Sequence, residues 1–219
     1  MDLRQVQSSV GVTLVGGGDP SRESLDEALK FAPTLVAADG GADRALAFEH
    51  VPQTVIGDLD SVSEAAISRI GAENVVQILD QNRTDFEKSI AVIDAPFVLA
   101  VGFANARIDH TLAVMTGLVC HVGAPVIVVG DEDLVFAAPL QLAVDLEVGT
   151  RFSVYPMTEV RGRSTGLEWP LDPHVFSPNG RVGTSNRVTG PVRLEFDGLG
   201  MLVITPRAAL ARVVAALTG

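Results

Sequence analysis

The sequence has little of what secreted or membrane-bound proteins are built from. Only one of its 219 residues is a cysteine, so no internal disulfide can form and a reducing compartment is expected. The apolar neighbours of that residue, Cys120, predict a buried helix position rather than a nucleophile. Apolar runs reach only about seven residues, far short of the ~20 that span a bilayer. The first residues show no charged-then-apolar leader. We therefore expect a cytoplasmic protein without a membrane segment.

Positive charge is also scarce. The chain has two lysines, Lys30 and Lys88, and fourteen arginines against 27 acidic residues, for a net charge of −11. A chain this acidic, with no basic stripe, would repel the backbone of a nucleic acid. An acidic cleft can still bind a polyphosphate that arrives with a divalent cation, and it favours a cationic substrate directly. Small molecules of these two kinds are therefore the expected partners, and nucleic acids are not.

Hydrophobic patterning predicts an α/β fold with a second, all-β part. The first 135 residues alternate apolar runs with helical patterns, which is typical of βαβ units and a mostly parallel open sheet flanked by helices. From residue 140 to residue 204, short alternating runs between turn residues indicate a C-terminal antiparallel β-sandwich, and an amphipathic helix is expected over 206–217. The predicted domains are residues 1–138 and 139–219. Parallel strands are expected at residues 12–15, 34–38, 54–56, 75–79, 97–101 and 126–129.

Helix starts in the first part are marked by capping residues. Asp19, followed by proline, predicts the N-cap of a helix that continues to residue 29. Ser61, with a glutamate three residues later, predicts the start of a helix that ends at Gly71. Asp109 can cap a long helix that ends near residue 122.

Acidic residues follow four of the expected strands. In an open α/β sheet, the loops beyond the carboxyl ends of the strands share one crevice, so distant acids can converge there. Carboxylates together with substrate phosphate oxygens are the ligands that Mg²⁺ prefers. The sequence therefore predicts a cation site that also suits a phosphate. The acids concerned are Asp39, Asp58, Asp60, Asp85 and Asp109.

These acids also have a purely structural interpretation. Asp58 and Asp60 can form a polar turn before a capped helix. Thr84 and Glu87 have the spacing of a capping box, and Asp85 then lies favourably in the first helical turn. Each motif taken alone therefore leaves both interpretations open.

Other residues near these turns have chemistry that suits a phosphate. Gly40, the first of two glycines after Asp39, allows a ligand to approach the backbone closely. Lys88 stands one helical turn beyond Asp85, and Arg107 offers a fork-shaped ligand for phosphate oxygens. In the β part, the turn that contains Ser185 and Asn186 is a hairpin loop by default, and the single tryptophan, Trp169, is by default a core or edge residue. Either could instead contact a flat ligand.

Five motifs follow one another along the chain: Ala38-Asp39-Gly40-Gly41-Ala42, Gly57-Asp58-Leu59-Asp60-Ser61, Asp80-Gln81-Asn82-Arg83-Thr84-Asp85-Phe86-Glu87-Lys88, Arg107-Ile108-Asp109-His110 and Gly183-Thr184-Ser185-Asn186. In this order they resemble those of thiamine pyrophosphokinase. The resemblance covers essentially the whole chain, and it implies an α/β catalytic domain followed by a β-sandwich. It also implies a homodimer with thiamine at the subunit interface. The implied reaction is Mg²⁺-dependent transfer of the terminal pyrophosphoryl group of ATP to the hydroxyethyl oxygen of thiamine, which gives thiamine diphosphate and AMP.

The resemblance also implies roles for single residues. The implied metal ligands are Asp58, Asp60 and Asp85, and these with Arg107 form the implied catalytic set. The implied nucleotide and phosphate pocket consists of Asp39, Gly40, Gln81, Thr84, Lys88, Arg107 and Asp109. The implied thiamine contacts are Ser185, Asn186 and Trp169.

One loop departs from the family pattern, and two other functions remain open. A glycine-rich turn is expected just before Arg107, but the chain has Ala106 there. A pyrophosphokinase for a hydroxymethyl pterin would use the same acids with a different acceptor pocket, although the polar turn in the β part favours thiamine. A catalytically silent regulator that binds thiamine or a nucleotide is the second alternative. Three retained acids, Asp58, Asp60 and Asp85, favour an enzyme.

Overall fold

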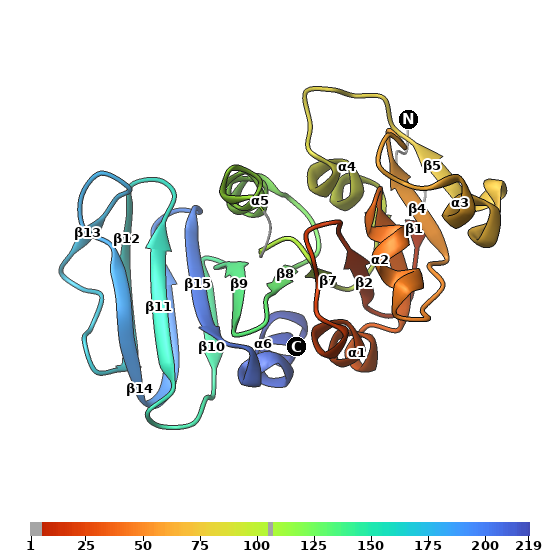
Figure 1. Ribbon diagram of the computed structural model, residues 1–219. Helices are drawn as coiled ribbons and strands as arrows, with labels where there is room; N and C mark the ends of the chain where they lie inside the picture. The colour runs from red at the N-terminus through yellow and green to blue at the C-terminus, as the bar shows by residue number, and fades with distance from the viewer. Residues whose placement is uncertain (1–5, 105–106) are drawn as a thin grey trace. The chain divides into compact units, whose positions relative to one another are not determined.

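A computed structural model describes residues 6–104 and 107–219 of the chain (Figure 1). The chain forms two units, one extending to Asp131 and the other spanning Glu132–Gly219, while the short segment Leu118–Cys120 groups with the second. The first unit contains a parallel sheet with helices, and the second is antiparallel β-structure with a terminal helix. The predicted fold class is therefore confirmed.

The parallel sheet of the first unit has the strand order β8-β7-β2-β3-β4-β5. Every residue of β2, β7 and β8 is buried, as expected for parallel strands that are covered on both faces. All six predicted strands are present, and β5 ends two residues earlier than expected. The strands are β2 (Val12–Val15), β3 (Thr34–Ala38), β4 (Thr54–Gly57), β5 (Val75–Gln77), β7 (Val98–Val101) and β8 (Val126–Val129), with a separate parallel pair of β1 (Val6–Gln7) and β6 (Ile93–Asp94).

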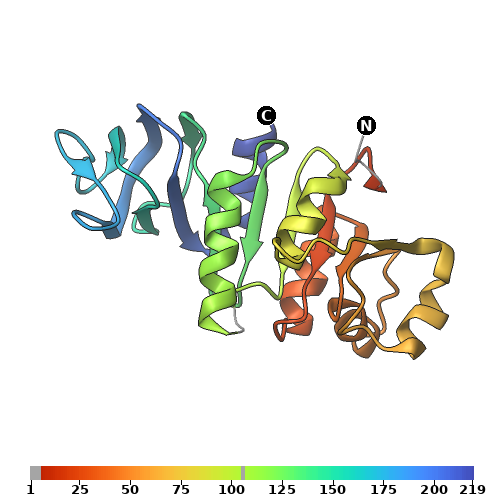
Figure 2. The same ribbon diagram turned by 90° about the horizontal axis from the view of Figure 1, so that it is seen from above.

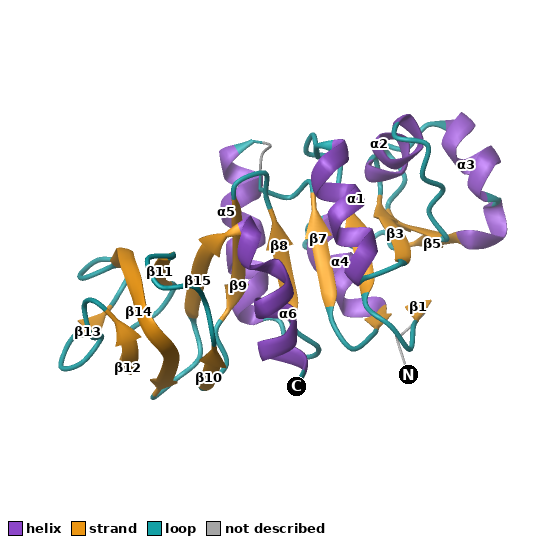
Figure 3. Ribbon diagram, turned by 90° about the horizontal axis from the view of Figure 1, so that it is seen from below, coloured by secondary structure: helices purple, strands orange, loops and turns teal. Residues whose placement is uncertain are grey.

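Helices cover both faces of this sheet. Helix α1 packs on β2 and β7 over one face (Figure 3), whereas α4 and α5 lie over the opposite face (Figure 2). Helix α4 contacts β3 and β4, the two strands that are followed directly by Asp39 and Asp58. The helices are α1 (Arg22–Phe31), α2 (Gly41–Ala47), α3 (Glu64–Ile70), α4 (Asp85–Val92) and α5 (Ile108–Cys120), with a short 3-10 turn η1 (Ala72–Asn74).

Three of the predicted helix caps are wrong. Ser21, not Asp19, caps α1 by accepting the backbone N–H of Ser24, while Asp19 adopts a left-handed conformation in the preceding loop. Ser63, two residues beyond the predicted Ser61, caps α3. Asp109 lies in the first turn of α5 rather than at its N-cap, which is Arg107. In each case the N-cap lies two residues from the position that the local pattern suggests.

The environment of Cys120 is also different from the prediction. Cys120 is the last residue of α5, as the helical pattern suggests, but it is exposed. The buried face of α5 contains Val114 and Leu118, and Cys120 lies outside that face. Apolar neighbours in sequence therefore did not imply burial of the cysteine. No helix among the described residues is both long and apolar enough to cross a bilayer.

The second unit is organised around one long strand, β14. Its first part pairs with β11, and its later part pairs with β10 and β12, so the strand takes part in two groups of antiparallel strands. The elements are β9 (Asp133–Ala137), β10 (Gln141–Val144), β11 (Arg151–Pro156), β12 (Val160–Leu167), β13 (Val175–Phe176), β14 (Gly183–Phe196), β15 (Met201–Pro206), the 3-10 turn η2 (Arg207–Ala209) and α6 (Leu210–Thr218). Helix α6 packs against β10 and buries Leu210 and Val213.

The border between the two units lies earlier than residue 138. Strand β9 pairs along its whole length with β15, in the register Val203↔Phe136, and so belongs to the antiparallel unit. The apolar run that forms β9 follows β8 closely, and by pattern alone it continues the α/β part. Pairing with a strand some 65 residues later decides its place, and this is a long-range contact that local sequence does not reveal.

Candidate active site

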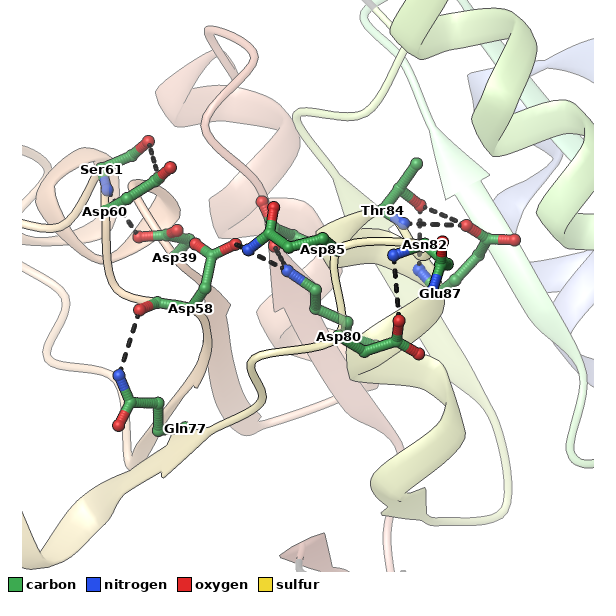
Figure 4. A network of polar contacts seen from close by, with 12 residues as sticks. Asp39, Asp58, Asp60, Ser61, Gln77, Asp80, Asn82, Thr84, Asp85 and Glu87 are labelled. Carbon is green, nitrogen blue, oxygen red and sulfur yellow. Dashed lines mark hydrogen bonds and ion pairs between the residues drawn. The ribbon is translucent and has the colours of Figure 1, made fainter.

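Three carboxylates converge where two neighbouring strands end. Asp39 follows β3 directly, and Asp58 and Asp60 follow β4, its parallel neighbour in the sheet. One oxygen from each of the three carboxylates lies within 4.8 Å of the others (Figure 4). Leu59, between the two acids of the second turn, has a left-handed φ of 72°, and the turn thereby departs from the alternation that would send Asp58 and Asp60 to opposite sides. We call Asp39, Asp58 and Asp60 the acid cluster.

Asp39 is the buried member of the acid cluster. Its side chain accepts the backbone N–H of Ser61 at 3.2 Å through Oδ1, while Oδ2 is buried and has no hydrogen-bond partner among the described residues. Burial, followed by the adjacent carboxylate of Asp58, raises the pKa of Asp39 from 3.8 to about 6. Gly57 makes room for this side chain, because a Cβ there would stand 3.0 Å from the Cβ of Asp39. A buried carboxylate oxygen without a partner suits a cation ligand.

Asp58 has the opposite character. A hydrogen bond from Lys88 is the main cause that lowers its pKa to about 2, and hydrogen bonds to Asp39 and Gln81 act in the same direction. Gln81 donates to Oδ2 at 3.1 Å, and Gln77 donates to the backbone carbonyl of Asp58 at 3.3 Å. Because the pKa of Asp39 is raised and that of Asp58 is lowered, a proton binds Asp39 in preference to Asp58, which stays ionised.

Helix α4 brings Asp85 and Lys88 to the same place. The Nζ of Lys88 lies 2.9 Å from Oδ2 of Asp58 and 3.0 Å from Oδ1 of Asp85, and the Lys88 side chain is only 3% exposed. The predicted capping box is present: the side chain of Thr84 accepts the N–H of Glu87, whose carboxylate accepts the N–H of Thr84. The structural interpretation of this motif is therefore confirmed. The same cap fixes the start of α4, from which Lys88 reaches Asp58.

Arg107 and Asp109 lie together but do not join the acid cluster. The guanidinium group of Arg107 donates to both carboxylate oxygens of Asp109, at 2.6 and 3.2 Å, and both side chains are largely exposed. This hydrogen bonding raises the pKa of Arg107 and lowers that of Asp109. In the preceding loop, Gly102 has a φ of 79°. Ala106, which departs from the family pattern, lies outside the described residues.

The expected hairpin loop at Ser185 and Asn186 is wrong, because both residues lie in the first part of β14, which pairs with β11. We call residues 183–186 the polar segment, and it contacts Trp169. The amide oxygen of Asn186 accepts the backbone N–H of Trp169 at 3.1 Å, and its amide nitrogen donates to the carbonyl of Trp169 at 2.7 Å. Ser185 has a left-handed φ of 64°, and its N–H donates to the hydroxyl of Ser153. Asn186 is buried, whereas Trp169 is 54% exposed. The polar segment thus fixes the backbone of Trp169, whose indole ring is exposed.

The sequence predicts that acids converge beyond the carboxyl ends of the strands, and Asp39, Asp58 and Asp60 do so. Asp109 pairs with Arg107 instead. Sequence reasoning missed the environment of Lys88. Lys88 was expected to reach outward to phosphate, but its ammonium group is enclosed by carboxylates, and no local pattern reveals that burial.

Comparisons with known proteins identify the family. Residues 25–135, which contain the acid cluster and α4, match the model of the thiamin pyrophosphokinase catalytic domain. Residues 140–199, which contain Trp169 and the polar segment, match the model of the thiamin pyrophosphokinase vitamin B1 binding domain. The chain belongs to the thiamin pyrophosphokinase family. The resemblance stated from its five motifs is confirmed, and the chain is an enzyme of this family.

Individual thiamin pyrophosphokinases agree with this placement. Thiamin pyrophosphokinase 1 of Caenorhabditis elegans is 30% identical over 176 residues, which cover 70% of this chain and 71% of that protein. Thiamine pyrophosphokinase 1 of rice is 26% identical over 200 residues, covering 73% and 76% of the two chains. The solved thiamin pyrophosphokinase of Candida albicans shares the fold with a TM-score of 0.75 over 92% of this chain and 91% of that one, at 17% identity.

Proposed function

We propose that the protein transfers the pyrophosphoryl group of ATP to the hydroxyethyl oxygen of thiamine, with Mg²⁺, giving thiamine diphosphate and AMP. The observation that carries the proposal is the convergence of three carboxylates at the ends of β3 and β4. This arrangement occurs in a chain whose two parts match a catalytic domain and a vitamin B1 binding domain.

The acid cluster has the donors that Mg²⁺ prefers. Asp58 and Asp60 supply carboxylate oxygens at the surface of the site, and Asp39 adds a buried oxygen that has no partner among the described residues. Asp85, which bonds to the same ammonium group of Lys88 as Asp58 does, is the fourth acid of the proposed site. When bound there with ATP, Mg²⁺ would neutralise charge on the phosphate oxygens.

The protein's own groups then have to align the phosphates and the acceptor alcohol. Gln81 donates a hydrogen bond to Asp58. Gly40 lets the backbone beside Asp39 pass close to Ser61, because a Cβ at Gly40 would lie 3.3 Å from the carbonyl oxygen of Ser61. Arg107 would bind phosphate oxygens by leaving Asp109, and this exchange costs little because the pair is exposed. Thr84 contributes through the cap that positions Asp85.

The acceptor pocket would use the second unit. Thiamine carries a cationic thiazolium ring, which suits an acidic protein and the face of an exposed indole such as that of Trp169. The hydroxyl of Ser185 is available to a polar edge of the ligand. Both ends of the Asn186 amide are already bonded to Trp169, so Asn186 would act through that residue.

We further propose that the protein works as a cytoplasmic homodimer, with thiamine bound at the subunit interface. Ile108 and Leu112, one helical turn apart on α5, are 80% and 61% exposed. A second copy of the chain would remove this apolar pair from water.

The direct test is incubation with ATP, Mg²⁺ and thiamine, followed by identification of the products. AMP and thiamine diphosphate in equal amounts are expected, and the reaction should stop when EDTA is added. A hydroxymethyl pterin serves as the competing acceptor, because a pterin pyrophosphokinase would use the same acids. The match of residues 140–199 to a vitamin B1 binding domain favours thiamine. Turnover of the pterin but not of thiamine would refute the proposed substrate.

A further inference from the structure

Lys88 stands where an ammonium group is unfavourable for two reasons. It is only 3% exposed, and burial disfavours the charged form of lysine. It is also the fourth residue of α4, close to the helix N-terminus, where the helix dipole repels cations. The only other lysine, Lys30, is exposed in the last turn of α1, where the dipole favours it. The position of Lys88 therefore requires specific compensation.

Two carboxylates from different elements provide that compensation. Nζ of Lys88 bonds to Asp58, in the turn after β4, and to Asp85, at the start of its own helix. Burial lowers the pKa of Lys88, but the bonds to the two carboxylates outweigh it, and the net shift is upward. The ammonium group thereby links α4 to the turn that carries Asp58 and Asp60, two of the three members of the acid cluster.

We propose that Lys88 is an internal counter-cation of the acid cluster. It holds Asp58 and Asp85 in place before any metal ion arrives, and its charge opposes a divalent cation at the same oxygens. The inference rests on the proposed Mg²⁺-ATP chemistry. It adds that the divalent cation binds together with the nucleotide rather than before it. The acids bind a bare divalent cation weakly, and they bind it well only when nucleotide phosphates bring negative charge that offsets Lys88.

The test uses Lys88→Met, which keeps the length of the side chain and removes its charge, with Lys30→Met as the matched control. In EDTA, Lys88→Met should lower the melting temperature by roughly 10 °C, because two carboxylates lose their partner. Saturating Mg²⁺ should restore most of this loss. Without nucleotide, the variant should bind Mn²⁺, measured by electron paramagnetic resonance, roughly tenfold more tightly or better than wild type. Lys30→Met should match wild type in all three measurements.

Other outcomes would overturn the proposal. Equal Mn²⁺ affinity in Lys88→Met and wild type, with a raised KM for ATP, would make Lys88 a phosphate ligand instead. If Lys88→Met does not fold, the double variant Lys88→Met/Asp58→Asn decides, since neutralising one carboxylate should restore folding. A double variant no more stable than Lys88→Met would refute the counter-cation role. These binding and stability measurements do not depend on turnover, so failure of the proposed reaction would be seen separately, as absence of AMP.

Discussion

At the scale of single residues, Asp58 is the acid on which the site depends most. It is the ionised partner of Asp39, Gln81 and Lys88 at once, and its carboxylate is part of the proposed metal site. We expect Asp58→Asn to lower the rate of AMP formation by at least ~100-fold, because a charged ligand is lost while the shape is kept. Circular dichroism should show an intact fold. Asp172→Asn, which changes an exposed acid of the second unit, is the control, and wild-type turnover by Asp58→Asn would contradict the assignment.

Asp39 should make the stability of the metal-free protein depend on pH. Its folded-state pKa of about 6 lies above its ordinary value of 3.8, so its protonated form favours the folded state. The stabilisation is complete below pH ~3.8 and is lost as the pH rises through ~6, by up to about 3 kcal/mol. In EDTA, Asp39→Asn should therefore gain free energy of unfolding relative to wild type between pH 4 and pH 7. Chemical denaturation at the two pH values measures this difference, and parallel profiles would show that Asp39 is not protonated in the fold.

At the scale of elements, the cap of α4 couples stability to activity. Thr84→Ala removes the side-chain half of the capping box and should cost about 1 kcal/mol, measured from the urea midpoint. Because the same turn positions Asp85 and Lys88, AMP formation should fall as well. Ser21→Ala removes the cap of α1 and should cost a similar amount of stability. Unchanged AMP formation in Thr84→Ala would separate the cap from the site.

The hydrogen bonds between Asn186 in β14 and the backbone of Trp169 allow two variants to be compared. Asn186→Ala leaves a backbone N–H and a carbonyl of Trp169 without their partners, which should destabilise the second unit by roughly 1–3 kcal/mol. Trp169→Ala should cost less stability, because the indole is half exposed. Both variants should raise the KM for thiamine more than the KM for ATP. Equal effects on the two KM values would remove Trp169 from the acceptor pocket.

The sequence was informative where structure depends on local pattern and less so where it depends on distant contacts. Strands β2, β3 and β8 have the predicted bounds, because continuous apolar runs mark buried parallel strands. The capping box of Thr84 was also predicted, since it lies within four residues. The place of β9, the burial of Lys88 and the bonding of Asn186 to Trp169 each depend on a residue at least 17 positions away. Motif order identified the family, and the acids that follow neighbouring strands predicted the convergence of Asp39 with Asp58 and Asp60.

At the scale of the whole molecule, the net charge of −11 agrees with binding of ATP only if cations offset the repulsion between the protein and the phosphates. ATP without a metal ion would be repelled by an acidic protein. Lys88, the cationic side chain of α4 at the acid cluster, is already paired with Asp58 and Asp85. A cationic acceptor is attracted directly. The charge distribution thus favours arrival of the nucleotide as its Mg²⁺ complex, in agreement with the role proposed for Lys88.

The proposed homodimer gives the last prediction. Sedimentation should show a species of about twice the 23.0 kDa of one chain. Leu112→Lys places a charge in the exposed apolar pair on α5, so it should shift the protein to monomers. If thiamine binds at the interface, the KM for thiamine should rise in parallel with dissociation and recover at high protein concentration. Val122→Lys, at a 91% exposed position beyond the end of α5, is the matched control and should remain dimeric. A monomeric wild type with full activity would rule out an interfacial site.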